Sequence, residues 1–217
     1  LTGWRQGDSV VSLGASTIPS AYLLPDLLAR FSVLHPDISF DIHQSDSSGV
    51  LRALRTGRFD LGLTGMAAPD EDLVFTPFYQ DAMVLIAPNT PEFSAAMAQH
   101  VPLAALLQSY PLLLREEGSG SQRSADDFLR AAGLEPDALH VAARLNDQES
   151  IKNLVAAGLG LAIVSAVSVA RERDRGDLLL FPLADAARSF YIVTRRHDFL
   201  SPAARQFFDF SVRFYTE

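Results

Sequence analysis

The chain has 217 residues, of which 48% are hydrophobic and 20% are charged, a composition typical of a globular protein with one large domain or two small ones. Asp and Glu outnumber Lys and Arg by 26 to 18, and the resulting net charge of −8 argues against nucleic-acid binding by the chain's own surface, which would need a positive stripe. The absence of cysteine excludes disulfides, cysteine nucleophiles and thiolate metal sites. No segment approaches the roughly 18 apolar residues of a membrane span.

Strands and helices alternate along the first 87 residues. Short β-branched or alternating runs predict strands at 10–14, 38–42, 59–64, 73–79 and 82–87. Apolar residues at helical spacing predict a helix at 20–33, where Pro25 predicts an irregular first turn. A second, short helix runs through Arg55 after a cap at 46–49. This order is typical of an α/β domain with a mainly parallel sheet.

A similar pattern begins again after Pro91. We expect strands at 112–115, 140–145, 161–165, 178–181 and 190–194, a tight turn at 117–121, and helices at 125–132, 148–157 and 167–172. Ser201 and Pro202 mark the start of a last, well-buried helix. Two units of similar size predict a two-lobed protein with a cleft at the carboxyl ends of its strands, where such folds bind ligands.

The residues of a catalytic centre do not come together in this sequence. No two of the five histidines lie within five residues of each other, so no helical metal pair exists. Phosphate loops of the GxxxxGK type and GxSxG elbows are absent, and the carboxylates are dispersed at turns. We therefore expect no enzyme, no catalytic residue, no metal and no cofactor.

Small hydroxyl residues and glycines follow several of the predicted strands. The residues in question are Ser16 and Thr17, Thr64 and Gly65, and Ser119 and Ser121, with Gln148 and Ser165 at two further strand ends. Hydroxyl donors beside the free N–H groups of a helix start form a site for an anion or a small polar ligand. The same residues are also ordinary helix caps, and Arg115 beside Glu116 is equally suited to a local ion pair or to a ligand contact.

Several motifs occur together in a fixed order along most of the chain, from about residue 8 to residue 214. They are GASTIP at 14–19, YLLP at 22–25, HP at 35–36, FDLGL at 59–63, REEGSGSQR at 115–123, VAAGLGLAIVS at 155–165 and LSPAA at 200–204. In this order they resemble the effector-binding domain of LysR-type transcriptional regulators.

The resemblance implies an α/β fold like that of the type 2 periplasmic binding proteins, with a mixed, mainly parallel sheet flanked by helices in each lobe. Lobe I would be residues 8–87 with 190–217, and lobe II residues 88–189. A winged helix-turn-helix head would precede this chain, which begins at Leu1 and is expected to be a fragment or a processed form. The head alone would contact DNA, and the whole protein would be a cytoplasmic homodimer or homotetramer with no membrane contact.

The resemblance also implies that a small effector binds in the cleft through Ser16, Thr17, Thr64, Gly65, Ser119 and Ser121. The GAST and REEGSGSQR stretches are similar to the branch of sulfur-assimilation and selenium-associated regulators, which suggests a sulfur oxyanion or a sulfur-linked metabolite. Pro19 departs from sulfate-responsive relatives, some of which have a polar residue there. A periplasmic solute receptor and an enzyme of the same fold are the alternative hypotheses.

Overall fold

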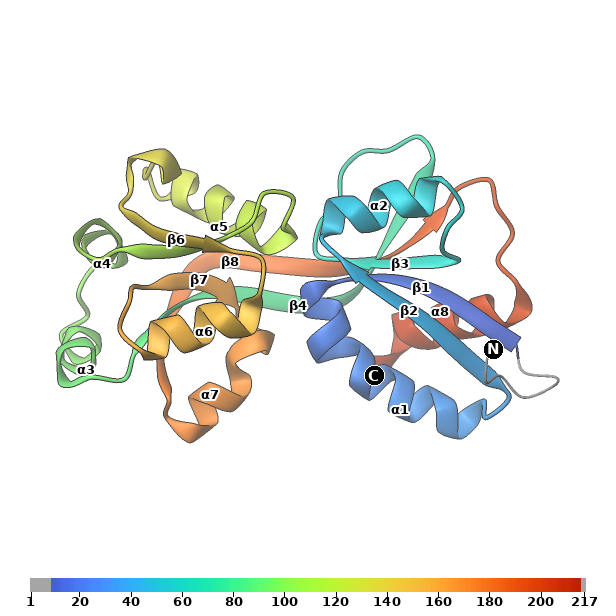
Figure 1. Ribbon diagram of the computed structural model, residues 1–217, viewed down its shortest axis with the longest axis horizontal. Helices are drawn as coiled ribbons and strands as arrows, with labels where there is room; N and C mark the ends of the chain where they lie inside the picture. Colours follow the sequence, from blue (N-terminus) through green and yellow to red (C-terminus); the bar gives the residue numbers. More distant parts are fainter. Residues whose placement is uncertain (1–8, 216–217) are drawn as a thin grey trace. The chain divides into compact units, whose positions relative to one another are not determined.

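The computed structural model describes residues 9–215, which divide into two compact units (Figure 1). Unit 1 takes in the chain up to Gln80 and from Ser189 onward, and unit 2 is Asp81–Arg188. The chain passes between the units inside two long strands, β4 (Leu73–Pro88) and β8 (Leu178–Arg195). The sequence pattern instead puts the borders at 87/88 and 189/190.

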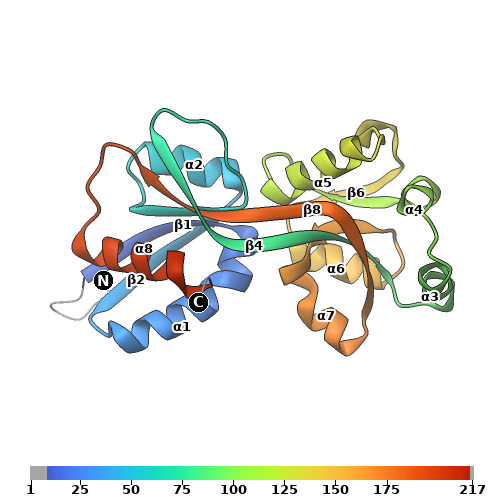
Figure 2. The ribbon, with the colours of Figure 1, turned by 180° about the vertical axis from the view of Figure 1, so that it is seen from behind.

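The two long strands correct the sequence prediction, which divides each of them into two short strands. Figure 2 shows both strands continuous from unit to unit. The polar residues Gln80 and Asp81 are typical of a turn, yet the backbone stays extended through them. The reason is tertiary, because the Asp81 carboxylate accepts hydrogen bonds from Ser165 and from the N–H of Val167, 84 and 86 residues away.

Unit 1 is a mixed, mainly parallel sheet flanked by helices, as the α/β prediction requires. Its elements are β1 (Ser9–Ser16), a π-helical turn (Pro19–Leu23), α1 (Leu24–Leu34), β2 (Ile38–Ser45), α2 (Ser47–Arg55), β3 (Leu61–Thr64), parts of β4 and β8, and α8 (Pro202–Phe214). Strand β1 lies between β2 and β3 and is parallel to both, whereas β8 pairs antiparallel with β3.

Helix α1 begins irregularly, as its proline predicts. Pro25 lies in the first turn, and a π-helical turn at Pro19–Leu23 precedes it. Proline has no N–H and cannot continue the regular backbone hydrogen bonds, so a wider turn is accommodated at this point. The irregular turn directly follows Ser16 and Thr17, and it therefore shapes one of the predicted ligand sites.

A cluster of aromatic side chains in unit 1 packs helix α8 against α1. Phe31 of α1 is fully buried, and its ring lies 5.2 Å from that of Phe207 and 5.7 Å from that of Phe40, both edge to face. The Ser201 hydroxyl accepts the N–H of Ala204 at 3.2 Å and caps α8 at its predicted start. The terminal helix is thus packed against α1, as its apolar residues predict.

Unit 2 combines two small sets of strands with several helices. Its elements are α3 (Pro91–Ala98), α4 (Leu103–Ser109), β5 (Leu112–Arg115), α5 (Gly120–Ala131), β6 (Val141–Leu145), α6 (Gln148–Ala156), β7 (Ala162–Ser165), α7 (Ala170–Arg175) and short 3₁₀ turns at Pro136–Ala138 and Ala166–Val169. Strands β5 and β6 are parallel, and β7 pairs antiparallel with β4. A parallel bridge between Leu112 and Leu161 connects the two sets.

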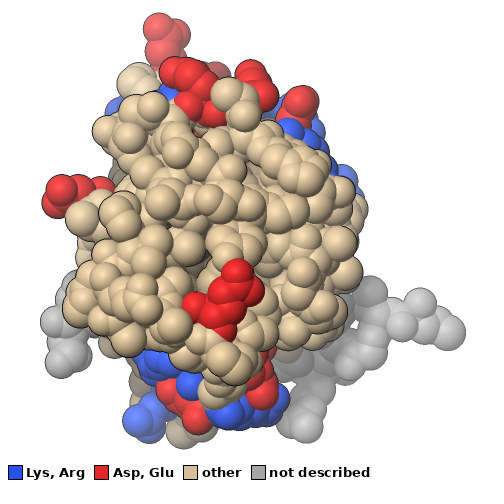
Figure 3. All heavy atoms as spheres, turned by 90° about the vertical axis from the view of Figure 1, so that its left-hand side faces the viewer, with Lys and Arg blue, Asp and Glu red and all other residues tan. Residues whose placement is uncertain are grey.

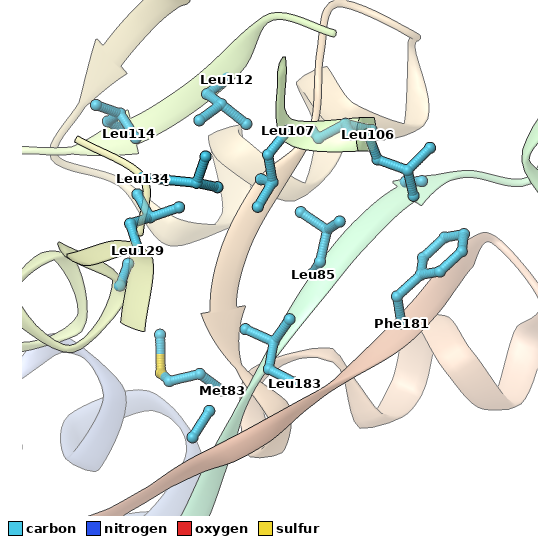
Figure 4. Close-up of a cluster of buried hydrophobic side chains, with 14 of the residues drawn as sticks. Met83, Leu85, Leu106, Leu107, Leu112, Leu114, Leu129, Leu134, Phe181 and Leu183 are labelled. Atoms are coloured by element: carbon cyan, nitrogen blue, oxygen red, sulfur yellow. The ribbon is translucent and has the colours of Figure 1, made fainter. Parts of the chain in front are cut away.

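The core of unit 2 is mostly aliphatic. Figure 4 shows leucines from α4, α5, β5 and β8 that point toward Leu85 of β4, which is completely buried. Burial of such side chains stabilises each one by about 1.5–3 kcal/mol relative to its exposed state. Both cores are mainly aliphatic, and the ring cluster of Phe31, Phe40 and Phe207 distinguishes unit 1.

Three helical segments of unit 2 depart from the sequence prediction. Helices α3 and α4 lie in a region for which no element is expected, although Thr90 and Pro91 form a helix-start signal. Helix α5 begins at Gly120 and not at residue 125, because Ser119 caps it by accepting the N–H of Gln122. The run of glycine and serine is typical of a turn, and the cap extends the helix into it.

Candidate functional site

In unit 1, the predicted ligand residues lie at the ends of two adjacent strands. Ser16 is the last residue of β1 and Thr64 the last residue of β3, and both are buried, with 5% and 0% of their surface exposed. The parallel pairing of Ala15 with Leu63 brings these two strand ends side by side. Thr17 and Gly65 follow directly along the chain and are partly exposed.

The two buried hydroxyls of unit 1 differ in their hydrogen bonds. Thr64 Oγ1 donates to the carbonyl of Met66 at 2.8 Å and closes the turn that follows β3. The Ser16 hydroxyl has no hydrogen-bond partner among residues 9–215. The donor and acceptor capacity of the Ser16 hydroxyl is therefore not taken up by these residues, so Ser16 is the better candidate for a ligand contact.

In unit 2, the N-terminus of α5 brings Ser119 and Ser121 to the end of β5. Ser119 caps the helix, whereas the Ser121 hydroxyl accepts a hydrogen bond from Nη1 of Arg188 at 3.1 Å. The same Arg188 nitrogen lies 3.4 Å from the sulfur of Met83. Arg188 is only 8% exposed, so a positive charge is held close to the first turn of α5.

Arg188 is the functional candidate that the sequence prediction misses. It lies inside β8, where Ala186, Arg188 and Phe190 alternate with more exposed residues and face the interior. A positively charged residue on the buried face of a strand can be recognised from the sequence pattern, but residues 182–189 were not predicted to form part of a strand. A buried guanidinium and the positive end of a helix macrodipole both favour an anion, so together they strengthen the predicted anion preference of this site.

Gln148 and Ser165 belong to a chain of hydrogen bonds within unit 2. Gln148 Oε1 accepts from Arg115 at 3.2 Å, and Gln148 Nε2 donates to Ser168 at 3.2 Å. Ser168 donates to the carbonyl of Ser165 at 2.7 Å, and the Ser165 hydroxyl donates to Asp81. Both predicted ligand residues thus have protein partners, which makes them weaker ligand candidates than Ser16.

Arg115 forms the local ion pair that the sequence left as one of two alternatives. Its guanidinium donates to both carboxylate oxygens of Glu116, at 2.8 and 2.9 Å, and Arg115 is only 4% exposed. Next to it, Asp147 caps α6, and hydrogen bonds from the hydroxyl and the N–H of Ser150 hold the pKa of that carboxyl below its usual value. These charges stabilise the strand ends from within unit 2.

Neither a metal centre nor a membrane helix is found within residues 9–215. No cluster of His, Asp and Glu is placed to hold a metal ion there, and none of the helices in this range is long and apolar enough to cross a membrane. Figure 3 shows the face of unit 2 over α3 and α4, which is mostly uncharged, with acidic side chains just below its centre and basic side chains only toward its edges. That face lacks the positive stripe that phosphate binding needs.

The fold and the strand-end hydroxyls define a small-molecule-binding α/β protein. The family model described as "LysR substrate binding domain" matches residues 5–215. The chain therefore belongs to the family of LysR substrate-binding domains. This membership confirms the resemblance, and it identifies a domain of transcriptional regulators and not an enzyme.

The curated relatives that are similar to this chain include transcriptional regulators. A probable RuBisCO transcriptional regulator of Cyanophora paradoxa is 30% identical over 207 residues, which are 93% of this chain and 63% of that protein. The uncharacterized HTH-type regulator YeiE of Escherichia coli K12 is 27% identical over 209 residues, 95% of this chain and 69% of that protein. The chain thus spans about two thirds of the length of these relatives.

Solved structures of regulator domains share the fold. The regulatory domain of CcmR from Synechocystis PCC6803, in complex with 2-PG, has a TM-score of 0.82 at 22% identity and covers 97% of this chain and 99% of its own. The cofactor-binding domain of Cbl has a TM-score of 0.80 at 21% identity, with 96% and 90% covered. The effector-binding domain of BenM with benzoate has a TM-score of 0.79 at 19% identity, with 97% and 94% covered. These likenesses confirm the predicted fold class.

Proposed function

We propose that this domain binds a small anionic effector and thereby controls DNA binding by a helix-turn-helix head in the same protein. The observation that carries the proposal is the buried guanidinium of Arg188, hydrogen-bonded to Ser121 in the first turn of α5. A buried cation beside a helix N-terminus favours negative charge strongly. Benzoate and shikimate, the effectors named for two regulator domains of the same fold, are carboxylates.

The proposed ligand contacts divide between the two units. Ser16, Thr17, Thr64 and Gly65 would serve from unit 1, and Ser119, Ser121, Gln148 and Ser165 from unit 2. Ser16 and Ser121 are the foremost of these, because one has no protein partner within the described residues and the other is directly bonded to Arg188. The proposed lobes remain residues 8–87 with 190–217 and residues 88–189.

The class of the effector is a narrower proposal. A sulfur oxyanion or a small sulfur-linked metabolite is supported by the GAST and REEGSGSQR motifs and, more weakly, by the fold shared with Cbl. An oxyanion accepts several hydrogen bonds at once, and the hydroxyl, N–H and guanidinium donors at the start of α5 are of that kind. Pro19 continues to argue against sulfate itself.

The partners of the whole protein are also part of the proposal. The names of the relatives support a transcriptional regulator, and full-length CbnR, which shares this fold, was solved with its target DNA. The family resemblance adds the proposal of a cytoplasmic homodimer or homotetramer. The present domain would contribute effector binding and subunit pairing, and only the head would contact DNA. A reading frame upstream of Leu1 that encodes no helix-turn-helix would contradict this part.

A thermal-shift screen tests the anion site. The probes are sulfate, sulfite, thiosulfate, selenite, O-acetylserine, benzoate and shikimate, and the measurement is the rise in Tm with probe concentration. A ligand that binds only the folded protein raises Tm by mass action. The rise should disappear in Arg188→Met and persist in Ser109→Ala, an exposed serine of α4 that serves as a control. An equal rise in Arg188→Met and in the wild type would overturn the site.

A further inference from the structure

A groove of about 500 Å³ opens on unit 2, and none of the eight proposed ligand residues lines it. The outer face of α5 forms one wall, and the segment of β8 at 184–187 forms the other. Met83 and Leu103, which belong to the aliphatic core and its margin, also line it. The volume lies within the range of about 300–1,000 Å³ that is usual for small-molecule sites.

The walls of the groove are apolar, and small side chains leave room between them. Alanines line both walls, at 131 and 132 on α5 and at 184, 186 and 187 on β8. Phe128 presents a partly exposed aromatic ring, and Met83 presents a polarizable thioether. Aromatic rings attract cations through their negatively charged faces.

The charge within the groove comes from two carboxylates. Asp185 is exposed, adopts a left-handed backbone conformation with φ of 56°, and has no hydrogen-bond or ion-pair partner among residues 9–215. Asp127 is 70% exposed in its side chain and forms an ion pair with Arg130 at 3.5 Å. Asp185 is therefore the carboxylate with the greater capacity to bind a cation.

Arg188 is the nearest opposing charge on β8, but it lies three residues further along the strand. At a rise of about 3.3 Å per residue, this places it roughly 10 Å from Asp185 along the chain. Arg188 is not among the lining residues, but its Nη1 atom lies 3.4 Å from the sulfur of Met83, which does line the groove, and 3.1 Å from the Ser121 hydroxyl. A cation at the Met83 end of the groove would therefore meet a poorly screened positive charge, so the favourable place for a cationic group is the end at the exposed Asp185.

From these observations, we propose that the groove binds a small organic cation with an apolar body. The cationic group would pair with Asp185 and lie near the ring of Phe128, and the apolar body would pack against the alanines and Met83. None of the eight proposed ligand residues lines this second site, but the two sites are neighbours, because Met83 of the groove contacts Arg188 of the anion site. The domain would then respond to two ligands of opposite charge.

Benzamidine is the probe, and phenylacetate is the control ligand of similar size and opposite charge. Binding is followed by isothermal titration and by the chemical shifts of the backbone amides at 127–132 and 184–187. We expect benzamidine to shift these amides with an affinity that falls as salt is added, and phenylacetate to leave them unchanged. Equal shifts with both probes, or no shift with benzamidine at 10 mM (roughly a −2.7 kcal/mol interaction by the affinity relation), would overturn the proposal.

Matched variants locate the binding site. Asp185→Asn keeps a side chain that tolerates the left-handed backbone, and it should weaken benzamidine binding by about fivefold, as the loss of an exposed ion pair predicts. Asp127→Asn should have a smaller effect, since Arg130 already shares that charge. Asp177→Asn, an exposed carboxylate outside the groove, should have none. An unchanged affinity in Asp185→Asn contradicts the proposal whether or not the anion screen succeeds.

Discussion

The two units place similar residues at the ends of their strands, but the surroundings of those residues differ. In unit 1, Ser16 has no partner within residues 9–215 and Thr64 bonds only to a nearby carbonyl, so its hydroxyls lie in neutral surroundings. In unit 2, Ser121 and Ser165 bond to the charged groups of Arg188 and Asp81. The hydroxyls of unit 1 thus have neutral partners or none within these residues, whereas two hydroxyls of unit 2 bond to charged groups, and the proposal of an anionic ligand rests on the cation among them.

Asp81 and Arg188, the charged partners of the two hydroxyls, lie at the borders of unit 2. Asp81 and Arg188 are the first and last residues of unit 2, at the two points where the chain crosses from one unit to the other. Each bonds to the predicted ligand residue nearest to it in the structure, Ser165 and Ser121 respectively. Two of the predicted ligand residues of unit 2 are thus each hydrogen-bonded to one of the strands that cross between the units.

The largest effect is expected for Arg188→Met, which removes the charge that distinguishes unit 2. Anion affinity should fall by about 2–3 kcal/mol, the usual cost of losing a hydrogen bond to a charged group. Titration calorimetry with the effector found by thermal shift is the measurement. Arg188→Lys should recover part of the affinity, because the charge returns without the forked geometry. If both variants bind as the wild type does, the charge assigned to unit 2 is wrong.

The next effect concerns stability. Asp81→Ala leaves the Ser165 hydroxyl and the Val167 N–H without their acceptor and should lower the free energy of unfolding by about 1–3 kcal/mol. Thr64→Val is the matched change in unit 1, and it should cost only about 1 kcal/mol because one neutral hydrogen bond is lost. Urea unfolding measures both. If Asp81→Ala and Thr64→Val lower the free energy of unfolding equally, the charged partner in unit 2 stabilises no more than the neutral one in unit 1.

A smaller effect is expected for the hydroxyls themselves. Ser16→Ala and Ser121→Ala should each weaken effector binding by about 1–2 kcal/mol, the cost of an unmade hydrogen bond. Ser121→Ala should also change the salt dependence of binding, because Arg188 loses a partner, whereas Ser16→Ala should not. Unchanged affinity in both variants would remove these residues from the site.

The smallest effect is a pH dependence located in unit 2. The hydrogen bonds from Ser150 hold the pKa of Asp147 below its ordinary value of 3.8, so the folded state binds fewer protons there than the unfolded state. The resulting stabilisation is present above pH 3.8 and is lost as pH falls through the lower pKa of the folded state. Asp147→Asn keeps a good helix cap without the charge.

Urea unfolding of the wild type and Asp147→Asn at pH 7 and at pH 3 checks this prediction. The wild type should be the more stable at pH 7, and the difference should shrink at pH 3. A difference that does not change with pH would mean that the carboxylate charge contributes nothing to the cap.

Local patterns predict most of the elements that surround the site. The alternation in Ile38, Phe40 and Ile42 places β2, and Ser201 with Pro202 places the start of α8. The order of these elements and the strand-end motifs are enough to indicate the LysR substrate-binding family and the positions of Ser16, Thr64 and Ser121. These features depend on residues close together in sequence, which is why they can be read without the fold.

Contacts between distant residues decide the rest. The sequence pattern predicts that a strand ends before Gln80 and Asp81. Only the hydrogen bonds from Ser165 and Val167 to the Asp81 carboxylate explain why β4 continues through them. No sequence motif marks Arg188 as a candidate ligand residue. Only the fold shows that β8 brings it to Ser121, which lies 67 residues earlier in the chain. The sequence by itself determined the fold class and the hydroxyl donors, because both follow from local periodicity and local capping. Only the tertiary structure decided the charge around those donors, because a buried charge needs partners that the chain supplies from far away.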